Sequence, residues 1–583
     1  MANFTSPEVR VTEIRKGPLV PTGRGQTIGG FLGITDKGPV NTPTLVTSFA
    51  EAQAVFGNYR TDSDLMYDVE LFFKNGGRFA YICRVTGAGG IASAVSSENS
   101  VGAIIDWEAS SIGVWADGTT VQTVRKAVRV TEIPSGANIG TGPFTHLDLV
   151  STSRIRVGDA CLVRSTNMAE TDTFRFVVTG ISGNRVSFAS SSPTDAITVA
   201  SPTDAIVEIL VFDAIVRDAA GNIIARYDNL RMSSLSARYF ETIVNNTFRT
   251  PVVAAINAAG SVATDLRPTD GTVTLAGGVD PTITDSSYIG GGSGSGTGLN
   301  AFEGFSDMDM LSVPGVYGTS NAVIKALLDF ADLMGTFEAI TDIPEGTSYS
   351  AAITFANSGV NKFTRYGEGY WYPRLKVLDP VTGAQKVVPS TGARQGIIAR
   401  THEARGTAKA AAGIEDGRVS GVIDVETRVT KAQYDLLYPA RINAIRVIQG
   451  KGICCMGNIT LDPTGEVIES GVAFYLLKLK KQLEANLQWV NFELNNATTR
   501  AKVVRNVTAI LRQDWRNGLL VGKKEADAFF VICDETNNDA VIQAQRKLNV
   551  RIGVAVTHAA EFVDITLEQD TRAIDAALAA SAG

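Results

Sequence analysis

Alternating apolar and polar residues predict an extended strand near each end of the chain. The stretch SPEVRVTEIRKGP, residues 6–18, places alternate valines on one face with no hairpin partner close behind it, and EFVDITLEQD, residues 561–570, alternates in the same way. Because an isolated strand is not stable in water, each needs a partner from far along the chain or from another chain. The residues expected to make these pairings are Val9, Val11, Thr12, Ile14, Val563, Ile565 and Leu567.

The region after the first strand has the pattern of an α/β unit. Strands are predicted at residues 28–34 and 78–85, the second of them reading RFAYICRV. Between them, Ser48 followed by Glu51 forms the capping box that starts a helix, and a second helix is expected over residues 65–73. The order strand, helix, helix, strand predicts a sheet covered by helices.

Between about residues 87 and 250 the helical period nearly disappears, and short β runs alternate with turns. The turn Ser182-Gly183-Asn184 between two of these runs is a strong hairpin signal. This region is predicted to be an inserted all-β domain. After Pro251 the α/β character returns, first with PVVAAIN as an apolar strand and then with a helix over residues 321–334.

Two long helices are predicted towards the end of the chain, near residues 467–490 and 498–511. Lysines and arginines outnumber acids by ten to three between Ser470 and Lys524, although the whole chain is acidic. A solvated helix face would account for this excess, but so would a surface that meets an acidic partner.

Composition narrows the class of protein. The chain has 583 residues, of which 44% are hydrophobic and 19% charged, values that indicate a globular protein of roughly two to four domains. Its net charge of −7 and pI of about 5.3 argue against nucleic acid as a partner.

The five cysteines include no C-x-x-C pair, which is typical of reduced, buried thiols. We expect no secretory signal and no membrane insertion, because apolar runs such as AFFVIC are far below the ~20 residues of a span.

Three patterns invite a catalytic or binding interpretation. The run GGGSGSGTG, residues 290–298, lacks the Gly-Lys-Ser/Thr of a phosphate loop and is interpreted as a mobile surface loop. His402-Glu403 begins like the H-E-x-x-H of zinc peptidases, but Gly406 stands where the second histidine is required, so we interpret a solvated polar segment. No flanking motif marks a Ser-His-acid triad. No catalytic residue, metal or cofactor is predicted. The alternative to a protein without catalytic activity is a hydrolase that uses His402-Glu403 or such a triad.

Several stretches, in order along the chain, resemble the tail sheath proteins of contractile bacteriophages and related injection systems. They are SPEVRVTEI, FLGITDKGPVNTPTLVTSFAEAQAVFG and DVELFFKNGGRFAYICRV near the start, LAGGVD, WYPRLKVLDP and GIIARTHEARG in the middle, and INAIRVIQGKGICCMGNITL, LRQDWRNGLLVG and AFFVICDETNN towards the end. One departure follows GIIARTHEARG, where the family tends to have Trp-Lys-Ala-Pro and this chain has TAKAAAG. The resemblance leaves out mainly the predicted β insert.

This resemblance implies a structural role. Sheath subunits of the family stack as hexameric rings around an inner tube and contract on a baseplate signal, which drives the tube through the host cell envelope. Their central domain is described as subtilisin-like in architecture without being a protease. Their terminal arms add strands to sheets of neighbouring subunits. The implied partners are other copies of the chain, the inner tube protein and the baseplate and tail terminator proteins, and the implied location is the virion tail, assembled in the host cytoplasm.

With the resemblance, the chain is predicted to be an α+β multidomain protein with extended terminal arms. The expected parts are an N-terminal arm (1–20), the first part of a discontinuous α/β domain (21–88), an outward-facing all-β insert (89–250), a central subtilisin-like α/β domain (251–425), a C-terminal core domain facing the tube (426–560) and a C-terminal arm (561–583). The residues expected on the basic surface towards the tube are Lys478, Lys481, Arg500, Lys502, Arg505, Arg512 and Arg516.

Overall fold

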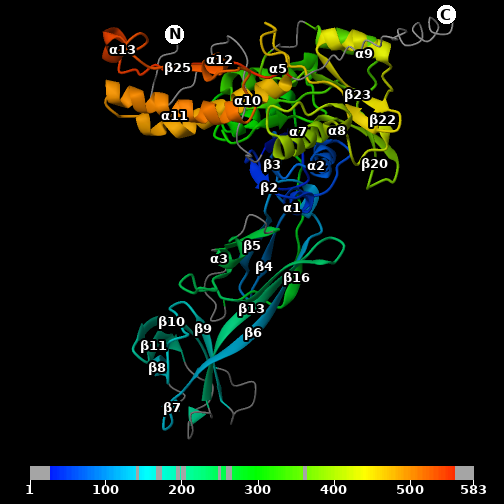
Figure 1. Cartoon of the computed structure of the whole chain (residues 1–583). Helices are drawn as coiled ribbons and strands as arrows, with labels where there is room; N and C mark the ends of the chain where they lie inside the picture. Colours follow the sequence, from blue (N-terminus) through cyan, green and yellow to red (C-terminus); the bar gives the residue numbers. More distant parts are fainter. Residues whose placement is uncertain are drawn as a thin grey trace, which may run out of the picture.

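The computed structural model is elongated (Figure 1). It describes residues 27–139, 143–165, 174–191, 197–198, 205–246, 251–257, 266–358 and 364–558. A β-rich region (94–274) lies at one end, an α/β part (27–85 and 285–469) follows, and a C-terminal part (470–558) lies on the side of the α/β part away from the β-rich region. The predicted arm strands, with Val9, Val11, Thr12, Ile14, Val563, Ile565 and Leu567, lie outside the described residues.

A five-stranded sheet is the centre of the α/β part. Its strands, in spatial order, are β18 (Glu338–Ala339), β17 (Met310–Ser312), β1 (Ile28–Gly33), β3 (Phe79–Arg84) and β2 (Thr44–Val46). The first four run parallel, and β2 is an antiparallel edge strand. The strands predicted at 28–34 and 78–85 are thus confirmed, as is the helix capped by Ser48, which is α1 (Phe49–Phe56).

Helices cover both faces of this sheet, because successive side chains of a strand point to opposite faces. Phe31 packs with α2 (Leu65–Lys74) and α7 (Thr391–Arg405) on one face. Leu32 packs with α5 (Ala322–Met334) on the other face. The sheet is therefore the middle layer of three.

The segment from residue 426 to residue 469 packs in the α/β part. Its strand β23 (Ile442–Ile448) runs parallel to β19 (Tyr370–Tyr372), and Leu437 joins the same hydrophobic core as Leu32. The domain boundary predicted at residue 426 therefore does not coincide with the packing, because the residues that follow it belong to the α/β part. That boundary was given with the family resemblance, and a pairing between distant strands leaves no trace in the local sequence pattern that could have corrected it.

The β-rich region is built on a long antiparallel ladder between β6 (Thr120–Glu132) and β13 (Ala205–Arg217). One half of the ladder contributes Phe212 to a hydrophobic core, and the other half contributes Val207 to a second core. Two strands that continue through both cores connect them into one extended body (Figure 1).

Strand pairing in the β-rich region continues past residue 250, where the insert was predicted to end. β15 (Val252–Ile256) pairs with β5 (Ala103–Ala109), and β16 (Gly271–Thr274) pairs with β6. The stretch PVVAAIN is a strand, as predicted, but the apolar pattern did not reveal which sheet it joins. The predicted hairpin around Gly183 is confirmed, since β10 (Phe174–Ser182) and β11 (Arg185–Ser191) pair across it.

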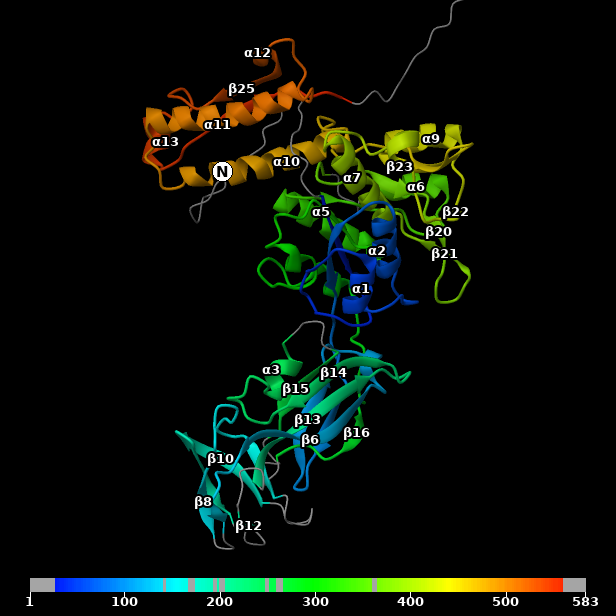
Figure 2. The ribbon, with the colours of Figure 1, turned by 60° about the horizontal axis from the view of Figure 1, so that its bottom comes forward.

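The C-terminal part contains the two predicted long helices, α10 (Ser470–Leu487) and α11 (Ala497–Arg516). They lie side by side (Figures 1 and 2), and their apolar faces share a core that includes Leu483 and Val507. A two-stranded sheet of β25 (Phe529–Ile532) and β26 (Arg551–Val554) contributes to the same core. All five cysteines of the chain are buried free thiols, as predicted.

Candidate assembly surfaces

Helix α11 has a buried apolar face and a cationic face. Its apolar positions Val503, Val507 and Leu511 are fully buried. On the opposite side, four cations fall within an arc of about 80°, since each residue advances ~100° around a helix. These four residues, which we call the basic stripe, are Lys502, Arg505, Arg512 and Arg516.

Three cations of the basic stripe are exposed to solvent. Lys502, Arg505 and Arg516 are exposed, and no described carboxylate forms an ion pair with them. Arg512 donates hydrogen bonds of 2.9 and 2.8 Å to the carboxylate of Glu525, and this guanidinium holds the pKa of Glu525 below its usual value. Because these side chains point away from the core, they are available to an anionic partner surface.

The other predicted cations lie elsewhere. Lys478 is half-buried on α10. Lys481 is 17% exposed and donates to Asp309 Oδ1 at 2.8 Å and to the carbonyl of Met308 at 2.7 Å. Arg500 is only 7% exposed. Lys481 and Arg500 are therefore not part of an exposed basic surface, because their charges are turned into the molecule.

The sheet of β25 and β26 leaves most of its two edges unpaired within the described residues, with Leu520 bridging Val556 just beyond the end of β26. The two strands pair antiparallel with each other, from Phe529 opposite Val554 to Ile532 opposite Arg551, and no third described strand joins them. Phe530 is 46% exposed on this sheet. A two-stranded sheet is marginal by itself, and unpaired edges are templates for a further strand.

An apolar group of side chains is exposed where α10 connects to α11. In this connection Phe492 is 88% exposed, Leu494 75% and Trp489 37%. The short helix α13 (Ala540–Ala544), whose Val541 is 63% exposed, lies at the same end of the C-terminal part (Figure 2). Phe492 also has a φ of 68°, a backbone conformation that bulky residues rarely adopt. Sequence reasoning missed this group, although the run WVNFEL breaks the helical period and offered a signal.

His402 and Glu403 do not form a site, and the interpretation as a solvated polar segment is wrong for His402. This histidine is buried in α7, its ring packs edge-on against Phe474 at 5.0 Å, and burial lowers its pKa to about 3. Glu403 points elsewhere and forms a 2.6 Å ion pair with Arg78. The helix is largely buried because it packs against α2 and the central sheet, which its polar sequence did not indicate.

The glycine run at residues 290–298 forms a turn-rich segment after a short helix, α4 (Asp285–Ile289). Within it, the backbone N–H of Gly294 donates to Glu303 Oε2 at 2.8 Å, and the N–H of Gly298 donates to Asn41 Oδ1 at 3.2 Å. These donors already serve the chain's own oxygens, so the geometry gives no support to a phosphate loop.

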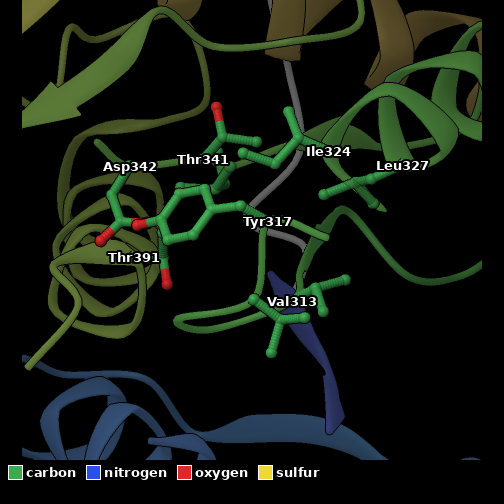
Figure 3. Close-up of a pocket in the computed structure, with 9 residues that line it drawn as sticks. Val313, Tyr317, Ile324, Leu327, Thr341, Asp342 and Thr391 are labelled. Atoms are coloured by element: carbon green, nitrogen blue, oxygen red, sulfur yellow. The ribbon is translucent and has the colours of Figure 1, made fainter. Parts of the chain in front are cut away.

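A small cavity near the start of α7 is lined mainly by aliphatic side chains, together with the polar groups of Tyr317, Thr341, Asp342 and Thr391 (Figure 3). Tyr317 donates to Asp342 Oδ1 at 2.8 Å and accepts from Arg374 at 2.6 Å. Thr391 donates to the neighbouring buried carboxyl of Asp68, whose pKa burial raises to about 8. Asp342 also forms a buried ion pair of 3.3 Å with Arg374, and Asp68 also accepts from the backbone N–H of Gly392 at 2.7 Å, so these polar groups already have partners inside the chain.

The cavity does not assemble a catalytic triad. His402 lies 11 residues beyond Thr391 on the same helix, which places it about 16 Å away along the axis. His146 contacts Thr145, and His558 pairs with Glu469 at 2.8 Å. Each histidine of the chain thus has its contacts away from the cavity, and a triad requires its three members together.

The described residues offer no candidate for metal binding or for a membrane-spanning helix. No group of three or more His, Cys, Asp or Glu side chains in this part of the chain could hold a metal ion. None of the described helices combines the length and the apolar character needed to cross a bilayer.

Comparison with solved structures identifies the fold. The chain superposes on the helical sheath of the anti-feeding prophage in its contracted state with a TM-score of 0.51 and 14% identity, covering 97% of this chain and 100% of that one. It superposes on a sheath tail protein from Listeria innocua with a TM-score of 0.51 and 9% identity, covering 89% of this chain and 90% of that one. No protein-family model and no curated protein matches the sequence. The chain therefore has the mixed α/β fold of contractile sheath proteins over nearly its whole length.

Proposed function

We propose that this chain is the structural subunit of a contractile tail sheath. The observation that carries the proposal is the extent of the likeness, since the fold is shared with two sheath proteins over 97% and 89% of the chain. The ordered sheath-like stretches of the sequence support the same conclusion. In this proposal the subunits stack as hexameric rings around an inner tube and contract to drive it through a cell envelope.

Electron microscopy of the purified protein tests this function. Negative staining should show hollow cylinders of uniform diameter, because a sheath subunit polymerises. Monodisperse particles that hydrolyse peptides or esters would instead support the alternative, a hydrolase. Substitution of His402 and Glu403 by alanine, one at a time, would then test whether these two residues carry the activity.

The β25–β26 sheet is the proposed acceptor for terminal arms of neighbouring subunits. Its unpaired edges can take an additional strand through backbone hydrogen bonds, and the sequence predicts unpartnered strands in both arms. Such a connection does not depend on how the domains it joins are rotated, so it can persist through contraction.

Deletion of residues 2–18 tests the arm connection. The truncated chain should fold and remain monomeric, as measured by thermal unfolding and analytical ultracentrifugation. The double substitution Val9→Asp and Val11→Asp should have the same effect, because it places charges on the apolar face of the strand, whereas Arg10→Asp on the opposite face is the matched control. Cylinders formed by the truncated chain would contradict the arm proposal.

The basic stripe and the β-rich region are assigned to opposite sides of the sheath from their charge and their position in the molecule. The basic stripe is proposed to face the inner tube, and the β-rich region is proposed to face outward, where its length is tolerated. The α/β part corresponds to the subtilisin-like central domain of the family. The baseplate and terminator proteins are the proposed partners at the two ends of the tail, and the proposed location is a virion tail assembled in the host cytoplasm.

A further inference from the structure

The first described residues of the chain, Thr27 and Ile28, contact α7 and Asp309, which in turn contact α10. Thr27 is buried, and its hydroxyl lies 3.2 Å from Nδ1 of His402 on α7. The backbone of Ile28 forms two hydrogen bonds with Asp309, one from its N–H to Oδ2 and one from the Asp309 N–H to its carbonyl, both of 3.0 Å. The N-terminal segment therefore enters the fold at a closely bonded point.

Helix α10 supplies the opposite side of this junction. Its Phe474 packs against the ring of His402, and its Lys481 donates to the second carboxylate oxygen of Asp309 at 2.8 Å. One carboxylate thus joins the root of the N-terminal segment to α10. Both side chains of the Asp309–Lys481 pair are mostly buried, at 14% and 17% exposed, so screening by solvent is limited.

The other end of the described chain meets the same helix. His558, the last described residue, lies 2.8 Å from the carboxylate of Glu469, which directly precedes α10. Two residues earlier, Val556 forms a β-bridge with Leu520. The roots of both terminal segments therefore contact α10 or the residue that caps it.

We propose that α10 is the internal anchor of both terminal segments, and that Asp309 and Lys481 are positioning residues for the N-terminal one. This gives Lys481 a role inside the subunit in place of contact with a tube. A displacement of one segment reaches the other through a single helix. In an assembled sheath, this displacement would pass force from one subunit to the next. This last step rests on the proposed sheath function.

Amide hydrogen exchange of the unassembled subunit tests the anchor at Ile28. Lys481→Met keeps the aliphatic stem and removes the charge, and it should speed exchange of the Ile28 amide about tenfold, because the carboxylate that accepts from this amide loses its partner. Asp309→Ala should speed it further. The double variant should match Asp309→Ala, since both changes act through one carboxylate.

Lys502→Met is the matched control, because Lys502 is exposed on α11 and should leave exchange at Ile28 unchanged. A purely structural role of Lys481 would speed exchange throughout α10 without a larger effect at Ile28. That result, or an effect at Ile28 no larger than that of Lys502→Met, would overturn the proposal. Because the measurement uses subunits that have not assembled, its outcome does not depend on whether the chain forms a sheath.

Discussion

Helices α10 and α11 carry similar residues and use them in opposite ways. Two of the three lysines of α10 are directed into the α/β part, where Lys480 donates to the carbonyl of Gly335 at 2.9 Å and Lys481 pairs with Asp309. Four of the five cations of α11, all except the buried Arg500, form the basic stripe on its solvent side. Charge therefore fastens one helix to its own subunit and leaves the other available for a partner. A count of charged residues cannot separate these two uses.

The difference between charges that hold α10 in place and charges exposed on α11 should be largest in the free energy of unfolding when a buried partner of the start of α10 is removed. Ser470 donates to Glu368 at 2.7 Å, and Glu368 also forms a fully buried ion pair with Arg394. Glu368→Ala should lower the free energy of unfolding by about 3–5 kcal/mol, because it leaves a buried guanidinium without its partner. Urea denaturation measures the loss.

The matched change beside α11 is Glu525→Ala, which breaks the exposed pair with Arg512. It should cost no more than about 1 kcal/mol, because water solvates both groups after the pair is broken. Equal losses for Glu368→Ala and Glu525→Ala would contradict the distinction between the two helices.

A second prediction concerns the contact between the helices. Tyr475 of α10 donates to the buried Asp514 of α11 at 3.0 Å, and burial raises the pKa of Asp514 from 3.8 to about 7. Between these pH values the folded state holds the proton that the unfolded state has released. The contribution of Asp514 to stability is therefore present at low pH and falls as pH rises from about 4 to 7, with a slope of up to about 1.4 kcal/mol per pH unit.

Asp514→Asn should remove this part of the pH dependence, since asparagine does not ionise and still accepts from Tyr475. Thermal unfolding of both proteins between pH 4 and 8 measures the difference in slope. Parallel pH profiles for the two proteins would show that Asp514 ionises in the folded state as readily as in the unfolded state.

The smallest effect on stability is expected at the basic stripe. Replacement of Lys502, Arg505 and Arg516 by glutamate should change the free energy of unfolding by no more than about 0.5 kcal/mol per site, because these side chains are exposed and form no ion pair with a described carboxylate. Co-sedimentation with inner tubes should nevertheless be abolished, since the surface potential is reversed. Unchanged co-sedimentation would refute the assignment of the stripe to the tube.

Local pattern was sufficient for elements whose signals are local. The capping of α1 by Ser48, the hairpin around Gly183 and the two long C-terminal helices were all predicted, because caps, turns and helical periods are written in neighbouring residues. The family resemblance also anticipated the fold that the solved structures share.

Pairing and burial between distant segments required the structure. The assignment of β15 to the β-rich region, the burial of His402 and the inward direction of Lys481 depend on neighbours far away in the chain. The same strand, histidine or lysine has an identical local pattern whether it is buried or exposed. The amino-acid sequence alone predicted many of the elements and the resemblance to sheath proteins, while packing in three dimensions determined which cations are exposed, because the environment of a charge is set by the groups that fold against it.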